Sequence, residues 1–448
     1  MNAPPIIVIG NGIAGITTAR HIRKKSTKPI LIISKESRFF FSRTALMYVY
    51  MGHLKWEHTQ PYENHFWKKN KLDLLEETVT QIDPKKKTIT LSNESILSYD
   101  SLVLATGSIP NKFGWPGENL KGVQGLYTKQ DLENLEALTP SIQETVIVGG
   151  GLIGIELAEM LHARGKKVTF LVREKSFWSN VLPKGESELI NKHIVSHGID
   201  LRLETNLGEI LEDEDGRVKA IRTDSGEIIS CQFVGLTAGV RPNVDFIKDS
   251  AIATKRGILV NKYLETNQPD IYAIGDCAEQ QEPVPGRRSI EAVWYTGRMM
   301  GETLARTLTG NKTAYHPGHW FNSAKFFDIE YQTYGLVAAH PEAPETHFHW
   351  QDSSKNLAVT IAFDKNSNEF LGINTFGIRM RHEIFDQMLS EKRSVFHVME
   401  HLSDCNFDPE FFKSYETEII SNFNAVQHTD IKPKKKSWSR IFNNLIAK

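Results

Sequence analysis

Cysteine is scarce in this sequence, and its scarcity excludes whole classes of protein. The three cysteines lie far apart and form no Cys-x-x-Cys pair, which excludes a disulfide framework and a four-thiolate metal site. An excess of charge is lacking too, because 53 basic and 54 acidic residues give a formal net charge of -1. Such a balance provides no field that would attract nucleic acid. We therefore expect a cytoplasmic protein without a nucleic-acid partner.

Long apolar runs are also missing. No stretch approaches the roughly 20 residues that a membrane-spanning helix needs. The first residues are not a cationic segment followed by an apolar stretch and a cleavage site, so we expect no secretory signal. The sequence predicts a protein that is soluble or peripheral to a membrane.

Two glycine-rich turns, by contrast, are present, each between a short apolar strand and a helix with apolar periodicity. The first unit covers residues 6–23 and the second covers residues 145–163. In a G-x-G-x-x-G turn, the first glycine allows the tight turn, the second lets a pyrophosphate approach the backbone, and the third lets helix and strand pack closely. The helix N-terminus then binds the phosphates. The predicted cofactor-binding residues here are Gly10, Gly12, Ile13, Ala14, Gly15, Gly149, Gly151, Leu152, Ile153 and Gly154.

An acidic residue follows each glycine turn at about the distance where dinucleotide sites place a ribose ligand. These residues are Glu36, beside Lys35, and Glu174, beside Arg173. Both acids lie two residues beyond the expected end of a strand, and the cation next to Glu174 could instead hold a 2'-phosphate. NADH and NADPH therefore both remain open, as does a solvated charged turn.

Further strands and helices are expected outside the two units. Residues 358–363 and 369–375 alternate like antiparallel strands, and helices are predicted near residues 382–389 and 408–415. The loop Trp115-Pro116-Gly117 is expected to be a crossing between domains.

The chain resembles the flavoproteins with two dinucleotide-binding domains, a family that includes ferredoxin and rubredoxin reductases, nitrite reductase flavin domains and type II NADH dehydrogenases. Besides both glycine turns, the resemblance is carried by Ala105-Thr106-Gly107, Gly239-Val240-Arg241-Pro242-Asn243 and the segment from Ile271 to Glu279. It implies an α/β fold with two Rossmann-like three-layer domains, the NAD(P) domain inserted in the FAD domain, and a C-terminal α+β domain. The implied boundaries are 1–115 with 245–315 for FAD, 116–244 for NAD(P), 316–425 for the C-terminal domain and 426–448 for a tail.

The resemblance also implies roles for single residues. Glu156 is implied as the catalytic residue beside the nicotinamide and the flavin, although an acid in the first turn of a helix also simply suits the helix dipole. Asp276 is implied as an FAD ligand, Trp294 as the start of a helix that faces the flavin, and Arg43 as an FAD-side contact. Turn, core-packing and surface roles stay open for these three. The other implied cofactor-binding residues are Ala105, Thr106, Gly107, Gly239 and Gly275.

The chain differs from the disulfide reductases, flavin peroxidases and flavin oxidases of the related superfamily, which carry redox cysteines. Residues 39–46 contain no cysteine, so the sequence predicts neither a thiol relay nor quinone-linked sulfide oxidation. His347 and His349 alternate on a strand, but no third ligand accompanies them by spacing, and we expect no metal site. In the family the C-terminal domain often forms a dimer contact, so a homodimer that includes Phe326 and Phe327 is implied.

The resulting functional prediction is an FAD-dependent NAD(P)H oxidoreductase that passes electrons to a ferredoxin, a rubredoxin or another iron-sulfur protein. One alternative is a peripheral membrane NAD(P)H:quinone oxidoreductase. It rests on residues 434–446, where a lysine run precedes Trp438, Ile441, Phe442 and other apolar residues on one helix face. This tail would contact the inner face of the membrane, bind a partner protein or remain solvated. Another alternative is a flavoprotein whose redox state regulates binding, with slow turnover.

Overall fold

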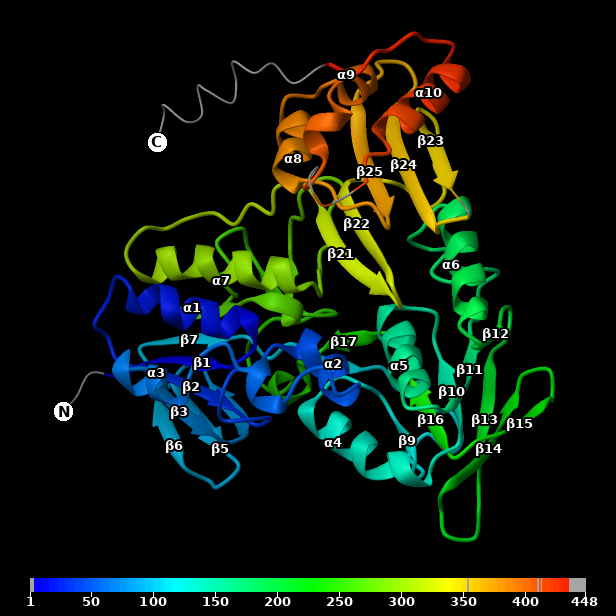
Figure 1. Ribbon diagram of the computed structural model, residues 1–448. Coiled ribbons are helices and arrows are strands. Elements are labelled where there is room, and N and C mark those ends of the chain that lie inside the picture. The colour runs from blue at the N-terminus through cyan, green and yellow to red at the C-terminus, as the bar shows by residue number, and fades with distance from the viewer. Residues whose placement is uncertain (1–3, 353, 409–410, 412, 435–448) are drawn as a thin grey trace. The chain divides into compact units, whose positions relative to one another are not determined.

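The computed structural model describes residues 4–352, 354–408, 411 and 413–434 (Figure 1). The described residues of Met1–Arg173 and Ile199–Pro317 form one compact unit, and those of Glu174–Gly198 and Gly318–Lys448 form a second. Among the helices of the described residues, none is long and apolar enough to cross a bilayer. The amphipathic face predicted for residues 438–446 lies outside the described residues.

The first unit contains a five-stranded parallel sheet built from both ends of its sequence. Its order is β19-β7-β1-β2-β3. The four residues of β1 are all buried, as expected of a parallel strand covered on both faces. The strands are β1 (Ile6–Ile9), β2 (Ile30–Ser34), β3 (Asp73–Glu76), β7 (Ser101–Leu104) and β19 (Ile271–Ala273).

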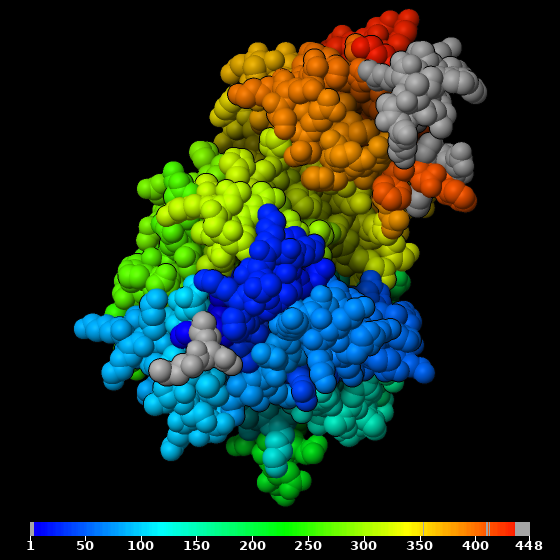
Figure 2. Space-filling view, turned by 90° about the vertical axis from the view of Figure 1, so that its left-hand side faces the viewer, coloured from blue at the N-terminus to red at the C-terminus, as the bar shows by residue number. Residues whose placement is uncertain are grey.

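Helices α1 (Ile13–Arg23) and α7 (Trp294–Leu308) pack against each other beside this sheet, although they are far apart in the sequence (Figure 1). The surfaces of the two helices adjoin in Figure 2, where α1 is dark blue and α7 yellow-green. A Cβ atom on Gly301 of α7 would lie 2.6 Å from the Ala14 carbonyl oxygen of α1, so this close packing requires glycine. The packing therefore brings the N-termini of both helices to the first parallel sheet.

A second parallel sheet is formed by the residues between β7 and β19. Its order is β12-β11-β10-β16-β9, and all its described pairings are parallel. The chain therefore leaves the first sheet, builds the second and returns, which confirms the predicted insertion of one Rossmann-like fold in another. The strands are β9 (Val123–Gln124), β10 (Glu144–Val148), β11 (Lys167–Leu171), β12 (Asp200–Arg202) and β16 (Phe233–Leu236), with helices α4 (Lys129–Leu138) and α5 (Leu152–Ala163).

Shorter elements complete the first unit. Two antiparallel three-stranded sheets comprise β4 (Val79–Asp83), β5 (Thr88–Leu91) and β6 (Ile96–Ser98), and β13 (Leu207–Glu212), β14 (Val218–Thr223) and β15 (Ile228–Ser230). Two strand pairs comprise β8 (Ser108–Pro110) with β17 (Val240–Pro242), and β18 (Ile258–Val260) with β20 (Ala278–Gln280). The short helices are α2 (Leu46–Tyr50), α3 (Asn64–Lys69), η1 (Arg43–Ala45), η2 (Trp56–Thr59), η3 (Thr139–Ser141), η4 (Asp245–Ile247) and η5 (Gly275–Cys277).

The second unit is an antiparallel five-stranded sheet with helices. Its order is β21-β22-β25-β24-β23, which confirms the antiparallel strands predicted for the C-terminal domain. The strands are β21 (Phe321–Phe326), β22 (Ile329–Gly335), β23 (Glu345–Asp352), β24 (Leu357–Asp364) and β25 (Phe370–Phe376). The helices are α6 (Lys184–Ser196), α8 (His382–Ser390), α9 (Val395–Glu400), η6 (Leu402–Cys405) and α10 (Glu416–Gln427). The separate domain boundaries expected from the sequence stay a prediction.

One expected helix is wrong. The described residues between 408 and 415 are not helical, and α10 begins at Glu416 instead. The reason is tertiary: Ile419, Ile420 and Phe423 reach the core of the second unit from α10, whereas Phe411 is 82% exposed. An apolar pattern specifies a helix only where its apolar face finds a core to pack against.

Candidate functional site

A cavity of about 720 Å³ lies at the carboxyl ends of the first parallel sheet, within the first unit. Its volume is within the range of cofactor pockets in proteins. The lining includes the first glycine turn from Gly10 to Ala14, the end of β2, the segment after β7 and the starts of α5 and α7. The sequence predicted most of these parts separately, and the fold brings them to one site. The predicted residues that line it are Gly10, Gly12, Ile13, Ala14, Lys35, Glu36, Arg43, Ala105, Thr106, Gly107, Leu152, Ile153, Glu156, Gly275, Asp276 and Trp294.

The first glycine turn has the geometry of an anion site. Gly10 has a φ of 110°, and a Cβ atom there would lie 2.1 Å from the Ala105 carbonyl oxygen. A Cβ atom on Gly12, in contrast, would meet nothing within 4 Å, so open space remains above this glycine. Gly12 is the N-cap of α1, and no side chain caps the helix there. The free N–H groups and the positive end of the helix dipole therefore face open space that suits a phosphate.

The second glycine turn repeats this geometry. Gly149 has a φ of 120°, and a Cβ atom there would lie 2.6 Å from the Thr237 carbonyl oxygen. A Cβ atom on Gly151, the N-cap of α5, would again meet nothing within 4 Å. Gly150 is not one of the predicted cofactor-binding residues, but a Cβ atom there would lie 2.8 Å from a Val172 methyl group. Gly149 and Gly150 are therefore needed because a side chain would not fit, whereas Gly151 leaves open space in front of the helix.

Glu36 binds neighbouring groups through both of its carboxylate oxygens. Arg43 donates to it from Nη1 at 2.9 Å and from Nη2 at 2.5 Å, and the Lys129 backbone N–H donates at 2.9 Å. The Arg43 guanidinium also lies 4.6 Å from the centre of the Tyr127 ring. Arg43 is thus fixed in the wall of the cavity by Glu36, which argues against a freely solvated surface arginine.

Asp276 is a half-buried carboxylate that accepts hydrogen bonds from two hydroxyl groups. Ser108 Oγ donates to its Oδ2 at 3.2 Å and the Tyr127 hydroxyl donates at 3.4 Å. Burial raises the pKa of Asp276, and the hydrogen bond from Ser108 partly offsets this rise. Ser108 and Tyr127 are not predicted site residues, because neither belongs to a motif. Tyr127 lies 149 positions from Asp276 along the chain.

Glu156 reaches the cavity from the first turns of α5. Burial raises its pKa to about 7, and the neighbouring Glu159 adds to the rise. No hydrogen bond or ion pair engages this carboxyl within the described part of the chain. A carboxyl poised near neutrality at a cavity wall is a typical candidate for a catalytic group.

The N-terminus of α7 faces the cavity as well. Ala292, Val293, Trp294 and Gly297 line the wall, and the N-cap Val293 has no side-chain hydrogen bond to the helix. The Trp294 and Tyr295 rings pack edge to face with their centres 5.5 Å apart. This helix end offers backbone donors toward the cavity, where developing negative charge would be stabilised.

Some predicted residues do not line this cavity. They are Gly15, Gly149, Gly151, Gly154, Arg173 and Gly239, while Glu174 belongs to the second unit. Gly15 and Gly154 serve close packing, because a Cβ atom on either would lie within 2.3 Å of a backbone oxygen. Glu174 accepts a hydrogen bond from Asn180 Nδ2 at 3.4 Å. Binding of a nucleotide by Arg173, Glu174 and Gly239 stays a prediction.

Comparison with known proteins identifies the family. The model of the pyridine nucleotide-disulphide oxidoreductases matches residues 4–301. The chain belongs to this family. Membership confirms the expected class, an oxidoreductase with FAD and NAD(P)H as cofactors.

Individual members of the family are similar over most of the chain. A rubredoxin-NAD(+) reductase from Acinetobacter baylyi is 30% identical over 325 residues, which cover 70% of this chain and 80% of that protein. The ferredoxin reductase subunit of a 5,5'-dehydrodivanillate O-demethylase from Sphingobium sp. is 29% identical over 341 residues, covering 75% and 82%. Other curated relatives are longer, and the chain spans as little as 35% of their length.

A solved structure supports the fold. The ferredoxin reductase from Rhodopseudomonas palustris superposes with a TM-score of 0.77 at 22% sequence identity, over 91% of this chain and 96% of that one. At this level of identity the likeness concerns the architecture. The two Rossmann-like folds and the C-terminal antiparallel domain are therefore those of the family.

The residues of the cavity fit FAD. The open space above Gly12 suits a pyrophosphate, and the half-buried Asp276 carboxylate can accept hydrogen bonds from hydroxyl groups. When bound, a flavin accepts a hydride from a nicotinamide and can release its electrons singly.

Proposed function

We propose that this family member takes hydride from NAD(P)H and delivers the electrons singly to a small iron-sulfur or rubredoxin-type protein. One observation carries the proposal: residues from the starts of both glycine-turn helices, Gly12 and Ile13 of the first and Leu152 and Ile153 of the second, line the same cavity. Two dinucleotides bound at these helix ends would meet there. The names of the rubredoxin and ferredoxin reductases among the relatives support the type of acceptor.

The residues that line the cavity argue against electron transfer through a cysteine thiol. No cysteine is among the described residues that line the cavity. Cys277, next to Asp276, is fully buried, its thiol contacts the carbonyl oxygens of Leu104 and Ile274, and burial raises the pKa of the thiol. A thiol with a raised pKa is a poor nucleophile. The electrons therefore leave the site without passing through a cysteine.

We assign Glu156 to the site where nicotinamide and flavin meet. Its carboxyl faces the cavity beside Leu152 and Ile153, with its pKa near 7. In this position it orients the nicotinamide cofactor and sets the charge beside the reacting ring. Backbone N–H groups at the start of α7 would stabilise negative charge on the flavin.

The test is anaerobic stopped-flow mixing of the FAD-loaded protein with NADH and, separately, with NADPH, while flavin absorbance is followed. Fast bleaching by one nucleotide is expected, and its rate identifies the preferred donor. The reduced protein is then mixed with a ferredoxin, a rubredoxin, a soluble quinone and dioxygen. Reoxidation by an iron-sulfur or rubredoxin-type carrier at least as fast as steady-state turnover supports the proposal. Absence of bleaching by either nucleotide would refute it.

The same acceptor series decides between the alternatives. Fast reoxidation by quinone alone, dependent on residues 434–446 and on lipid vesicles, would favour the membrane-bound quinone reductase. Bleaching without reoxidation by any acceptor would favour a redox-regulated binding protein. Sedimentation of the full chain tests the homodimer implied by the family resemblance.

A further inference from the structure

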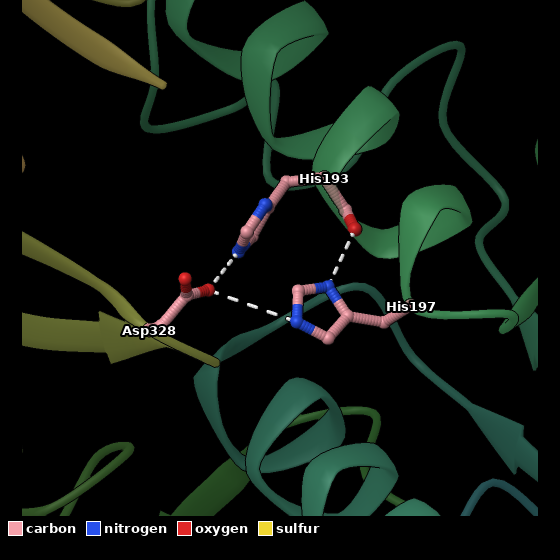
Figure 3. Close-up of side chains that lie close together, drawn as sticks. All are labelled: His193, His197 and Asp328. Atoms are coloured by element: carbon pink, nitrogen blue, oxygen red, sulfur yellow. Dashed lines mark hydrogen bonds and ion pairs between the residues drawn. The ribbon is translucent and has the colours of Figure 1, made fainter. Parts of the chain in front are cut away.

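Two histidines and an aspartate meet in the second unit, apart from the cavity described above. His193 lies near the end of α6 and His197 is its C-cap residue, four positions later. Residues four apart lie on the same face of a helix. Asp328 lies in the two-residue turn between β21 and β22. The three side chains point toward one another in Figure 3.

The ligand atoms of this cluster lie at short distances. Asp328 Oδ1 is 2.7 Å from His193 Nε2 and 3.7 Å from His197 Nε2, and all three ligand atoms are within 4.8 Å of one another. Ligand atoms around a tetrahedral zinc ion are separated by about 3.3 Å, as follows from Zn–N and Zn–O bonds of about 2.0–2.2 Å. The distance from Asp328 Oδ1 to His193 Nε2 is shorter than this separation, and the distance to His197 Nε2 is longer. The Asp328 side chain is 77% exposed on its turn, so it can make the small shift required.

Both imidazoles are prepared to act as ligands. The Nδ1–H of His197 donates to the His193 carbonyl oxygen at 2.9 Å, which leaves the lone pair on Nε2, the atom that faces Asp328. A backbone hydrogen bond of this kind is the usual support of a metal-binding histidine. His193 Nε2 is buried and has no aligned hydrogen-bond partner in the described part of the chain, although Asp328 Oδ1 lies 2.7 Å away.

Phe327, the residue before Asp328, packs against both imidazole rings and fixes their orientation. Its ring stacks on the His197 ring with the centres 4.2 Å apart and an angle of 17° between the planes, and it meets the His193 ring edge to face. Phe327 has a φ of 56°, a conformation that a bulky residue rarely adopts. The turn thus places Phe327 on the imidazoles and the next residue, Asp328, at their Nε2 atoms.

We propose that His193, His197 and Asp328 form a binding site for a divalent transition metal ion of the zinc type, with water as the fourth ligand. Two imidazoles and one carboxylate are a ligand set that zinc accepts, and three protein ligands leave one position open. The ion joins the end of α6 to the β21–β22 turn within the second unit. It also coordinates the buried His193 Nε2, for which the described residues offer no aligned hydrogen bond.

A second group of potential ligands, His397, Glu400 and His401, is less suitable. The Lys434 ammonium group lies 3.4 Å from Glu400 and 3.3 Å from His401 Nε2, so a cation already faces these atoms. His401 also binds Asp404 through Nδ1 at 3.0 Å. This group provides an internal comparison for the experiment.

The experiment is a titration of the chelator-treated, full-length protein with Zn²⁺ by calorimetry and with Co²⁺ by visible absorption. We expect one saturable equivalent and the intense visible bands of four-coordinate Co²⁺, without a thiolate-to-metal band. His197→Gln and Asp328→Asn should each weaken binding at least about tenfold, because even the loss of a partner behind a ligand has that effect. His193 is left unchanged because it is buried.

Two matched variants and a folding check make the outcome decisive. His340→Gln, at an exposed histidine of the second unit, and His401→Gln, in the other group, should both bind Zn²⁺ as the parent does. Circular dichroism should be the same for every variant. The proposal is overturned if the parent shows no saturable binding, if His197→Gln and Asp328→Asn bind as tightly as the parent, or if binding is lost only in His401→Gln.

Discussion

Replacing Glu186 by glutamine should stabilise the protein above neutral pH and change little in acid. Glu186 lies in the first turn of α6 and is completely buried. Its Oε2 accepts a hydrogen bond from Asn374 Nδ2 at 2.9 Å, whereas its Oε1 has no hydrogen-bond partner among the described residues. No cation forms an ion pair with this carboxyl among the described residues. The charged form is therefore held in an environment that favours the neutral acid.

The magnitude follows from the pKa of Glu186, which burial raises from 4.5 to about 7. Below about pH 4.5 the group is protonated in the folded and the unfolded state, and it contributes no dependence on pH. Between pH 4.5 and 7 only the unfolded state loses the proton, so stability falls as pH rises. Above pH 7 the full penalty remains, about 3 kcal/mol at about 1.36 kcal/mol per pKa unit. Glu186→Gln removes this penalty because glutamine carries no charge.

The assay is urea unfolding of the full-length parent and variant from pH 5 to 8, followed by circular dichroism. The free energy of unfolding of Glu186→Gln minus that of the parent should increase with pH and level off above pH 7. Glu188→Gln is the matched control, because Glu188 is on the same helix with its side chain 53% exposed and 3.8 Å from the Lys184 ammonium group. Its effect should stay within about 0.5 kcal/mol at every pH. A difference for Glu186→Gln that does not depend on pH would refute the reasoning.

Three further predictions concern the cavity. Glu156→Gln should remove an inflection near pH 7 in the rate of anaerobic flavin reduction by NAD(P)H, because the parent carboxyl has its pKa there; an unchanged pH profile would contradict its role. Gly12→Ala should fold like the parent but purify with little FAD, because the new Cβ atom occupies the open space above the turn. Gly10→Ala should instead lose more than about 2 kcal/mol of stability, because its Cβ atom clashes with the Ala105 carbonyl oxygen. Urea unfolding of both apoproteins and the flavin absorbance of both preparations separate the two effects, and equal stabilities would contradict the geometry. Asp276→Asn should weaken FAD binding about tenfold or more, the size expected for a lost hydrogen bond to a charged acceptor, as measured by fluorescence titration of the apoprotein; unchanged affinity would exclude Asp276 as a ligand.

Features specified by neighbouring residues were predicted correctly, whereas features that depend on tertiary packing were not. Both glycine turns were found because a strand, a tight turn and a helix start are specified by neighbouring residues, and the structure shows the required φ angles at Gly10 and Gly149. The helix expected at residues 408–415 was wrong. The apolar residues that pack in the core of the second unit, Ile419 and Phe423, belong to α10, which begins at Glu416. Periodicity reports that a face is apolar, and only the packed fold shows whether that face is covered.

The partners of the cavity residues could not be predicted. Tyr127 donates to Asp276 across 149 positions of sequence, and Ser108 donates to the same carboxylate across 168. Neither residue is part of a motif, and a hydroxyl group can serve as a donor almost anywhere. The pairing of Glu36 with Arg43 was also missed, although the two are only seven positions apart, because a turn and a 3-10 helix determine how they approach.

Short-range spacing in the sequence determined the two glycine turns between strand and helix, because neighbouring residues specify such a turn in any conformation. The resemblance of further motifs to a known family implied the flavin-dependent class and the insertion of one dinucleotide fold in the other. Only the tertiary structure decided which carboxyls are buried and where distant ligands meet. His193 and His197 already have the spacing of two ligands on one helix face, but Asp328 joins them only because a strand turn ends beside that helix. Burial and long-range proximity arise when the chain packs, so neither can be read from local spacing.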